Sequence, residues 1–284
     1  MGSALGARLR DGGARVLVAL DGRSERTRRL AAETALEDVG ALETLVAEAD
    51  VVLSVVPPGA AVEVAEAIGA AARGGTALVA DLNAIAPATA ERVARALGAA
   101  GLEAVDGSIS GPPPHAPGST RLYLSGARAG EVAALPFEGV ERVVVGETIG
   151  LASAVKMCTA SVYKGRVALL AQALRAAHRY GVVDHVVDDL EGTGLVNRDR
   201  VGGTLGKASA KAWRYVPEME EIAAAQAGAG LTPSLFLAVA TVYADIAGRA
   251  LGDAPEAVPD DVPLADVLAR LTAAGEAPGA AAAS

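Results

Sequence analysis

The chain has 284 residues, of which 51% are hydrophobic and 21% are charged, and its formal net charge is -9. This length and apolar content favour two domains with sizeable cores. The negative charge argues against nucleic-acid binding, the single cysteine excludes an internal disulfide, and three scattered histidines offer no spacing for a metal site. With no apolar run of the ~18 residues that a membrane span needs and no signal-peptide layout, we expect a cytoplasmic protein that acts on a small molecule away from membranes.

Through the first half of the chain, short β-rich segments alternate with Ala-rich helical segments. The expected strands cover residues 14–20, 50–56, 77–80, 102–106, 121–125 and 140–145. The expected helices cover residues 1–12, 26–35, 41–49, 62–72 and 87–100. This alternation is typical of a doubly wound α/β sheet.

A proline-rich segment, residues 108–120, interrupts this pattern. It contains Pro112, Pro113 and Pro114 in succession, which fit neither a helix nor a central strand. We expect a stiff loop, and loops at the strand ends of such sheets commonly form ligand sites.

After Gly150 the strand signals end, and the chain reads as helices to about residue 271. Breaks are expected near residues 181, 192–194, 217, 228–233 and 252–263. We therefore predict a nucleotide-binding-like α/β domain over 1–148, an all-α domain over 149–274 and a disordered tail over 275–284.

Lys156 lies in an apolar stretch at the start of this helical half, between Val155 and Met157. An amine in such surroundings has a lowered pKa because desolvation disfavours its charged form, which suits proton transfer near neutral pH. The alternative is an interfacial lysine whose stem packs while its ammonium group reaches water. The neighbouring Cys158 is expected to be an ordinary buried thiol.

Six motifs occur in an order found in one known superfamily. They are residues 1–5, 21–24, 55–59, 81–87, 106–111 and 150–156. In this order they resemble the β-hydroxyacid dehydrogenases, which include 3-hydroxyisobutyrate dehydrogenase, 6-phosphogluconate dehydrogenase and tartronate semialdehyde reductase. Residues 156–158, 163–165 and 218–223 are most similar to the branch with a phosphogluconate-dehydrogenase-like C-terminal domain of unknown function.

The resemblance implies a fold and an activity. The fold is a Rossmann-type doubly wound parallel sheet followed by an all-α domain, and the activity is that of an NAD(P)-dependent oxidoreductase acting on a small hydroxy acid. Lys156 matches the catalytic lysine of the family, a general acid/base.

For the cofactor, the resemblance implies contacts from Gly2, Arg23, Ser24, Val56, Pro57 and Asn83. Arg23 and Ser24 match the positions where NADP-preferring members carry Arg followed by Thr or Ser, so the guanidinium group would clamp a 2′-phosphate. We therefore expect NADP, although Asp21 would instead bind a ribose diol and favour NAD. As alternatives, Arg23 is a solvated turn residue, Val56 and Pro57 simply end a strand, and Asn83 forms a turn.

For the substrate, Ser110 and Gly111 match the Ser-Gly pair that holds a carboxylate in other members. The alternative is a turn-forming Ser-Gly. This chain departs from the usual Ser-Gly-Gly by carrying Pro112, which removes one backbone donor. It also has Ala160 where the family has an Asn one helical turn after the lysine. From these departures we expect recognition of the substrate to differ from that of other members.

The chain also begins inside the dinucleotide fingerprint, since Gly2 corresponds best to its last glycine. The first strand of the family fold, which is central in the sheet, is missing and would leave an open position. We expect that about ten residues, a strand followed by Gly-x-Gly, belong ahead of Met1 in a functional enzyme.

Two other functions stay open at the level of sequence. An imine reductase is the closest enzymatic alternative, because the same fold reduces C=N bonds. A cofactor-binding or scaffold protein without turnover is the other, given the incomplete fingerprint and Ala160. In each case we expect a homodimer formed through the broad apolar faces of the helical domain.

Overall fold

The computed structural model describes residues 1–72, 74–252 and 254–273, and the predicted tail over 275–284 lies outside them. The chain separates into two compact units, Met1–Cys158 and the residues from Thr159 onward. The predicted domain boundary at 148/149 lies ten residues earlier. Helix α7 (Leu151–Tyr180) contributes its first residues to one unit and the rest to the other.

Unit 1 contains all the strands found in the described residues. They are β1 (Leu17–Val18), β2 (Glu37–Asp38), β3 (Val51–Ser54), β4 (Leu78–Asp81), β5 (Glu103–Ser110), β6 (Arg121–Ser125) and β7 (Glu141–Gly146). The helices of this unit that precede α7 are α1 (Gly2–Asp11), α2 (Glu25–Glu33), α3 (Leu42–Glu48), a 3-10 turn η1 (Pro58–Ala60), α4 (Ala61–Ala72), α5 (Pro87–Ala99) and α6 (Ala129–Ala133).

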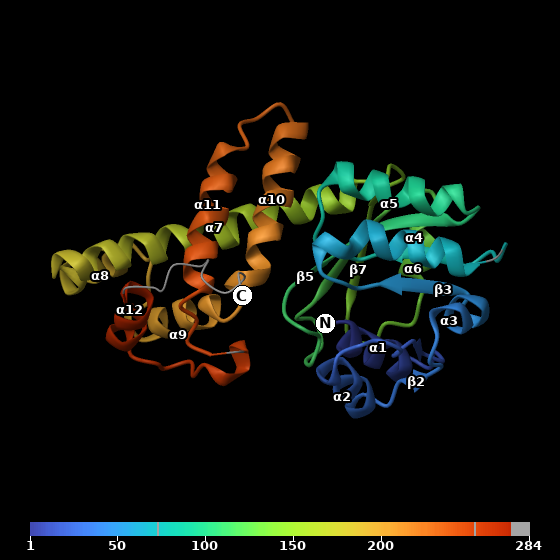
Figure 1. Ribbon diagram of the computed structural model, residues 1–284, viewed down its shortest axis with the longest axis horizontal. Coiled ribbons are helices and arrows are strands. Elements are labelled where there is room, and N and C mark those ends of the chain that lie inside the picture. Colours follow the sequence, from blue (N-terminus) through green and yellow to red (C-terminus); the bar gives the residue numbers. More distant parts are fainter. Residues whose placement is uncertain (73, 253, 274–284) are drawn as a thin grey trace, which may run out of the picture. The chain divides into compact units, whose positions relative to one another are not determined.

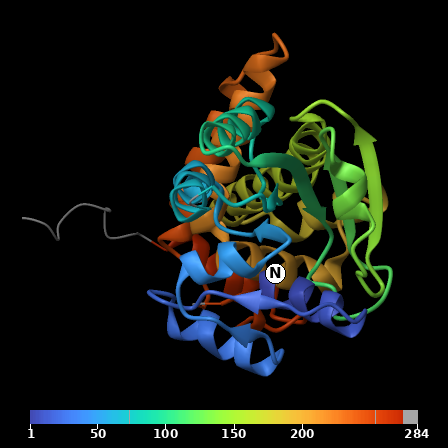
Figure 2. The same cartoon turned by 90° about the vertical axis from the view of Figure 1, so that its right-hand side faces the viewer.

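The described strands form two sheets, one of order β1-β2 and one of order β3-β4-β5-β6-β7. Strands β3, β4 and β5 pair in parallel, β6 runs antiparallel to β5, and β7 runs parallel to β6. Strands β1 and β2 are not hydrogen-bonded to β3 within the described residues. Figure 2 shows the blue β1–β2 elements and the green β6–β7 ribbon at different edges of the unit.

Helices cover both faces of the larger sheet. Helices α4 and α5 pack on one face through Ile68, Val93 and Leu97, whereas α1 packs on the other through Leu5 and Leu9. Figure 1 shows α4 and α5 above β3 and α1 below it. The continuous apolar character of the predicted strands follows from this burial on both faces.

Unit 2 is helical over its described residues, as predicted. After α7 come α8 (Val183–Gly192), α9 (Arg198–Ser209), α10 (Ala212–Gly228), α11 (Ser234–Ala247), a 3-10 turn η2 (Pro255–Ala257) and α12 (Leu264–Thr272). None of the helices described is long and apolar enough to cross a membrane. Helices α7 and α11 expose large apolar side chains, including Val162, Leu169 and Leu235, but the homodimer stays a prediction.

Several local predictions were wrong. Strand β5 continues to Ser110, so the irregular segment begins later than residue 108, because Ser108 to Ser110 pair with β6. Pro217 lies inside α10 instead of ending a helix. Cys158 is exposed, not buried. The short strand β2 and helix α6 were missed.

Candidate functional site

Asn83 links the two segments that follow the neighbouring strands β3 and β4, and both segments carry residues predicted to bind the cofactor. Strands β3 and β4 pair in register from Val51 and Leu78 to Ser54 and Asp81, so the segments that follow leave the sheet at the same edge. The side chain of Asn83 accepts a hydrogen bond from the backbone N–H of Val56 at 2.7 Å and donates to Asp81 Oδ2 at 2.7 Å. Asn83 is buried, so its side chain holds the segment of Val56 and Pro57 in place.

The Asp81 carboxylate beneath this clamp is itself buried and accepts further from the backbone N–H of Asn83 at 3.0 Å. Burial raises the pKa of Asp81 to about 6 from 3.8, and the neighbouring Asp106 carboxylate adds to the rise. The two residues are register partners on β4 and β5. A strand-end carboxyl that titrates near neutral pH therefore lies under the predicted cofactor edge.

This titration predicts a pH dependence of stability. Because the folded pKa of Asp81, about 6, lies above its ordinary value of 3.8, the folded chain binds more protons than the unfolded chain between these values. The free energy of unfolding should therefore fall by about 1–3 kcal/mol as the pH rises through this window. Urea unfolding of the unaltered chain and of Asp81→Asn at several pH values would measure it. A pH profile that is the same for both chains would contradict the assignment.

Gly2 lies at the start of α1, next to β3. A Cβ on Gly2 would meet the Val55 Cβ at 3.6 Å, an ordinary contact, so packing does not demand a glycine at this position. The helix has ten residues, and its N-cap, Met1, provides no side-chain hydrogen bond. The side chain of Met1 therefore does not cap the first N–H groups of α1, which lie at the edge of the sheet where Val56 begins. N–H groups at a helix N-terminus favour a negatively charged ligand.

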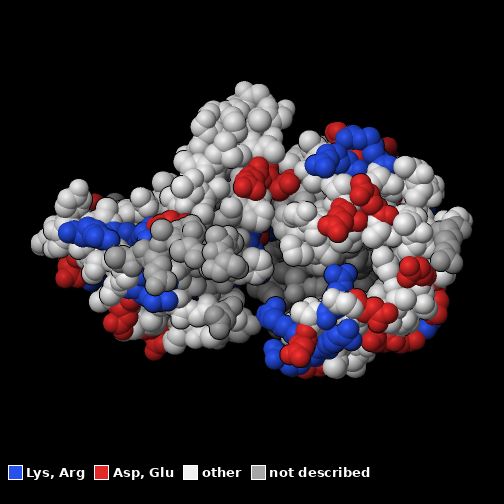
Figure 3. All heavy atoms as spheres, viewed as in Figure 1, with Lys and Arg blue, Asp and Glu red and all other residues white. Residues whose placement is uncertain are grey.

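Arg23 and Ser24 form the turn between β1 and α2. Ser24 is the N-cap of α2, since its hydroxyl accepts from the backbone N–H of Thr27 at 3.3 Å. Arg23 is exposed, and within the described residues no hydrogen bond or ion pair occupies its guanidinium group. Figure 3 shows basic side chains, with acidic ones among them, over the part of unit 1 where Figure 1 places α2.

Asp106 fixes the start of α7 on the sheet. Its carboxylate accepts hydrogen bonds from the backbone N–H groups of Gly150 at 2.9 Å and Ser153 at 3.0 Å. It also accepts from the hydroxyls of Ser153 at 2.6 Å and Ser125 at 2.9 Å. Burial raises the pKa of the Asp106 carboxyl against these hydrogen bonds. A carboxylate placed at a helix N-terminus also interacts favourably with the helix dipole.

Lys156 lies one turn further along α7 and points to β5. Its Nζ donates to the backbone carbonyl of Ile109 at 2.7 Å. Burial lowers the pKa of the Lys156 ammonium group, as the apolar sequence around it predicts. Ala160, on the following turn, is buried.

The geometry of β5 brings Ser110 to the same place. The hydroxyl of Ser108 donates to the carbonyl of Ala152 on α7 at 2.9 Å, so this face of β5 looks at α7. Because side chains alternate along a strand, Ser110 lies on the same face of β5 as Ser108. Lys156 follows Ala152 by one helical turn, so it lies on the same face of α7 as Ala152. Ser110 and Lys156 therefore lie on the same side of β5, next to Ile109.

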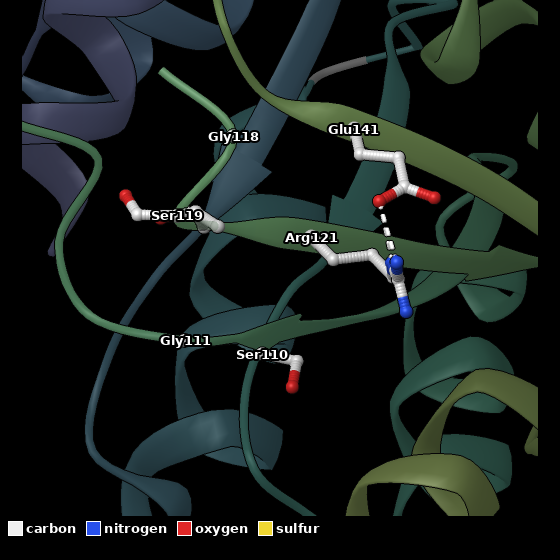
Figure 4. A pocket seen from close by; sticks show the side chains of 7 residues that line it. Ser110, Gly111, Gly118, Ser119, Arg121 and Glu141 are labelled. Atoms are coloured by element: carbon white, nitrogen blue, oxygen red, sulfur yellow. Dashed lines mark hydrogen bonds and ion pairs between the residues drawn. The ribbon is translucent and has the colours of Figure 1, made fainter. Parts of the chain in front are cut away.

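Gly111 ends this strand in a conformation that glycine favours. Its φ is +106°, and a Cβ would lie 2.3 Å from the carbonyl oxygen of Ser119. The Thr120 hydroxyl donates to the Pro112 carbonyl at 2.6 Å and closes the proline-rich loop. Ser110 and Gly111 line a pocket of about 210 Å³ together with Arg121 and Glu141 (Figure 4).

Sequence reasoning missed the hydrogen bonds that join Asp106, Ser125 and Ser153, and it missed that Arg121 lines the pocket beside Ser110. Asp106 was recognised only as part of a motif, although a carboxylate directly after a buried strand is a usable signal. The partners of Asp106 lie 19 to 47 residues away, and only strand register brings them together.

A second polar cluster lies within unit 2. Lys164 forms an ion pair with Glu218, and its Nζ lies 4.7 Å from the centre of the Tyr215 ring. The Tyr243 hydroxyl donates to the Lys164 carbonyl at 2.8 Å. These contacts join α7, α10 and α11. Among the described residues, no group of three or more His, Cys, Asp or Glu is placed to hold a metal ion.

The doubly wound sheet of unit 1, with the N-terminus of α1 at one strand edge and the half-buried Lys156 beside β5, is the arrangement of a dinucleotide-binding α/β fold. Residues 1–136 match the NAD binding domain of 6-phosphogluconate dehydrogenase, and residues 177–246 match a domain of unknown function, DUF1932. These two matches support the β-hydroxyacid dehydrogenase superfamily for this chain.

Similar solved structures agree with this assignment. A conserved hypothetical protein from Sinorhizobium meliloti 1021 is 28% identical with a TM-score of 0.64, over 95% of this chain and 92% of that one. MTH1747, a conserved protein of unknown function whose structure resembles 3-hydroxyacid dehydrogenases, is 29% identical with a TM-score of 0.61, over 86% and 93%. The Mycobacterium tuberculosis 3-hydroxyisobutyrate dehydrogenase shares the fold at 22% identity and a TM-score of 0.65, over 96% of each chain.

A curated relative covers a smaller part of the chain. An uncharacterised 28.5 kDa protein of Methanothermus fervidus is 28% identical over 178 residues, which is 63% of this chain and 68% of that protein.

Proposed function

We propose that this protein is an NAD(P)-dependent oxidoreductase that interconverts a small hydroxy acid and its carbonyl form, with Lys156 as the general acid/base. The observation that carries the proposal is the position of the Lys156 ammonium group. It is half-buried, lies against the Ile109 carbonyl at 2.7 Å and faces the side of β5 that carries Ser110. A nicotinamide cofactor, when bound, supplies or accepts the hydride.

The role of Lys156 is to move a proton at the substrate oxygen. With its pKa lowered by burial, the amine gives up a proton more readily than a solvated lysine does and takes one back in the reverse direction. The carbonyl of Ile109 orients Nζ. Ser110 and Gly111 hold the substrate through a hydroxyl and a backbone N–H group.

Residues of unit 1 are suited to hold the cofactor. The first turn of α1 offers N–H groups to a pyrophosphate, and the clamped segment of Val56 and Pro57 borders the same edge. The guanidinium group of Arg23, which has no hydrogen bond or ion pair among the described residues and lies beside the N-terminus of α2, suits a 2′-phosphate and favours NADP. Asn83 acts by positioning Val56.

Arg23 provides a test of the cofactor preference. Arg23→Ala should weaken NADP binding roughly tenfold or more, because charge-assisted hydrogen bonds to the 2′-phosphate are lost. NAD binding should change little. Arg29→Ala is the matched control, since Arg29 lies on α2 and pairs with Glu33. Calorimetric titration of both cofactors would measure the difference, and equal losses for NADP and NAD would contradict the role.

The reaction itself is tested by incubating the protein with NADP or NAD and a panel of small hydroxy acids, following nicotinamide reduction. Oxidation of one of them supports the proposal. Reduction of cyclic imines without oxidation of any hydroxy acid would favour an imine reductase. Cofactor binding with neither reaction would favour a protein without turnover.

A further inference from the structure

The pocket beside Ser110 contains a charged residue that the family resemblance did not predict. Ser110 on β5 pairs in register with Arg121 on β6, and Arg121 pairs with Glu141 on β7. Register partners project from the same face of a sheet. These side chains therefore form one row across three strands, on the face of β5 that looks at α7. Figure 4 shows Ser110 and Arg121 leaving neighbouring strands toward the same side.

Two side chains hold the guanidinium group of Arg121 in place, but they do not occupy all of its N–H donors. Its Nε and Nη2 each lie 2.7 Å from Glu141 Oε2, and Nη1 donates to the Tyr123 hydroxyl at 3.2 Å. Arginine has five N–H donors in a planar fork, so donors are left for a further acceptor. The Arg121 side chain is 48% exposed, which leaves it open to a ligand in the pocket.

A positively charged side chain at this position would replace a hydrogen-bond donor that the chain lacks. Pro112 follows Gly111 and has no N–H group, so the chain lacks a backbone donor for an anion bound at Ser110. Guanidinium groups bind carboxylates through paired, charge-assisted hydrogen bonds.

We infer that Arg121 is a specificity-determining residue that binds the carboxylate of the substrate together with Ser110, and that Glu141 holds the guanidinium group in position and competes with the carboxylate for it. The inference rests on the proposed function for the reaction, but the anion site exists independently of turnover. It restricts the substrates to carboxylates and excludes neutral alcohols and cationic imines from efficient use.

The two halves of the ion pair should have opposite effects on binding. Malonate, which carries carboxylates but no hydroxyl to oxidise, is a suitable probe, and malonamide is its uncharged counterpart. Arg121→Ala should weaken malonate binding at least tenfold, as expected for hydrogen bonds to a charged group, and Arg121→Lys should restore part of it. Glu141→Gln should tighten binding because the competing carboxylate is removed. Malonamide should bind weakly to every variant.

Calorimetric titration measures these affinities, and circular dichroism confirms that each variant is folded. Arg128→Ala is the matched control, because Arg128 is also ion-paired, with Glu131, but does not line the pocket. Equal malonate affinity in Arg121→Ala and the unaltered protein would overturn the inference. So would a lack of malonate binding in the unaltered protein, or equally weak binding in Arg121→Ala and Glu141→Gln. Arg121-dependent malonate binding without oxidation of any hydroxy acid would instead contradict the proposed function and leave the carboxylate site standing.

Discussion

Lys156→Ala is expected to lower kcat roughly 10²–10⁴-fold with any hydroxy acid that the protein oxidises, because general acid/base catalysis contributes about that much. Cofactor affinity should change little, since Lys156 lies against Ile109 and not at the edges of β3 and β4 where Val56 and Asn83 lie. Steady-state kinetics and calorimetric titration of the cofactor would measure the two effects separately.

Two variants distinguish proton transfer from charge and packing. Lys156→Arg keeps a positive charge, but a guanidinium group does not release its proton in proteins, so this variant should be as slow as Lys156→Ala. Lys207→Ala, at a half-buried lysine paired with Asp260, should keep full activity. A normal kcat in either Lys156 variant would exclude the general acid/base role.

The largest effect on stability is expected at Asp106. Asp106→Ala removes the acceptor for Gly150, Ser125 and Ser153 and leaves their buried N–H and O–H groups without a partner. Leaving such groups unsatisfied costs about 3–5 kcal/mol in total. The melting temperature should fall by roughly 10 °C, which calorimetry or circular dichroism would measure.

A surface carboxylate provides the comparison for this variant. Glu131 is exposed and paired with Arg128, so Glu131→Ala should melt close to the unaltered protein. If Asp106→Ala also melted there, the hydrogen bonds to Asp106 would not be what holds α7 to the sheet.

The order of strands and helices could be predicted because the local sequence of each element reflects which of its faces are buried. The apolar run around Val52 predicts a strand covered on both faces, and Pro87 marks the first turn of α5. The small strand β2 was missed because Glu37 and Asp38 are exposed and polar, so nothing in the local pattern favours a strand. Its pairing with β1 is decided by tertiary structure.

The candidate site was only half predictable for a similar reason. Lys156 was found from its apolar neighbours, which act within one helical turn. Arg121, by contrast, lies eleven positions after Ser110 in the sequence, and only the antiparallel register of β5 and β6 makes them neighbours. The proline loop between them hides this register, because its length and direction follow no simple periodicity.

Most of the hydrogen bonds that Asp106 accepts come from residues at the start of α7, so this strand carboxylate depends on a segment outside the sheet. A shortened chain ending at residue 148, where the helical half begins in the sequence, would lack Gly150 and Ser153 and leave the Asp106 carboxylate buried with few donors. A chain that keeps residues up to Cys158 retains them. The first turns of α7 therefore pack as part of unit 1 although most of that helix belongs to the other unit, so recombination at residue 148 would separate Asp106 from the donors that satisfy it.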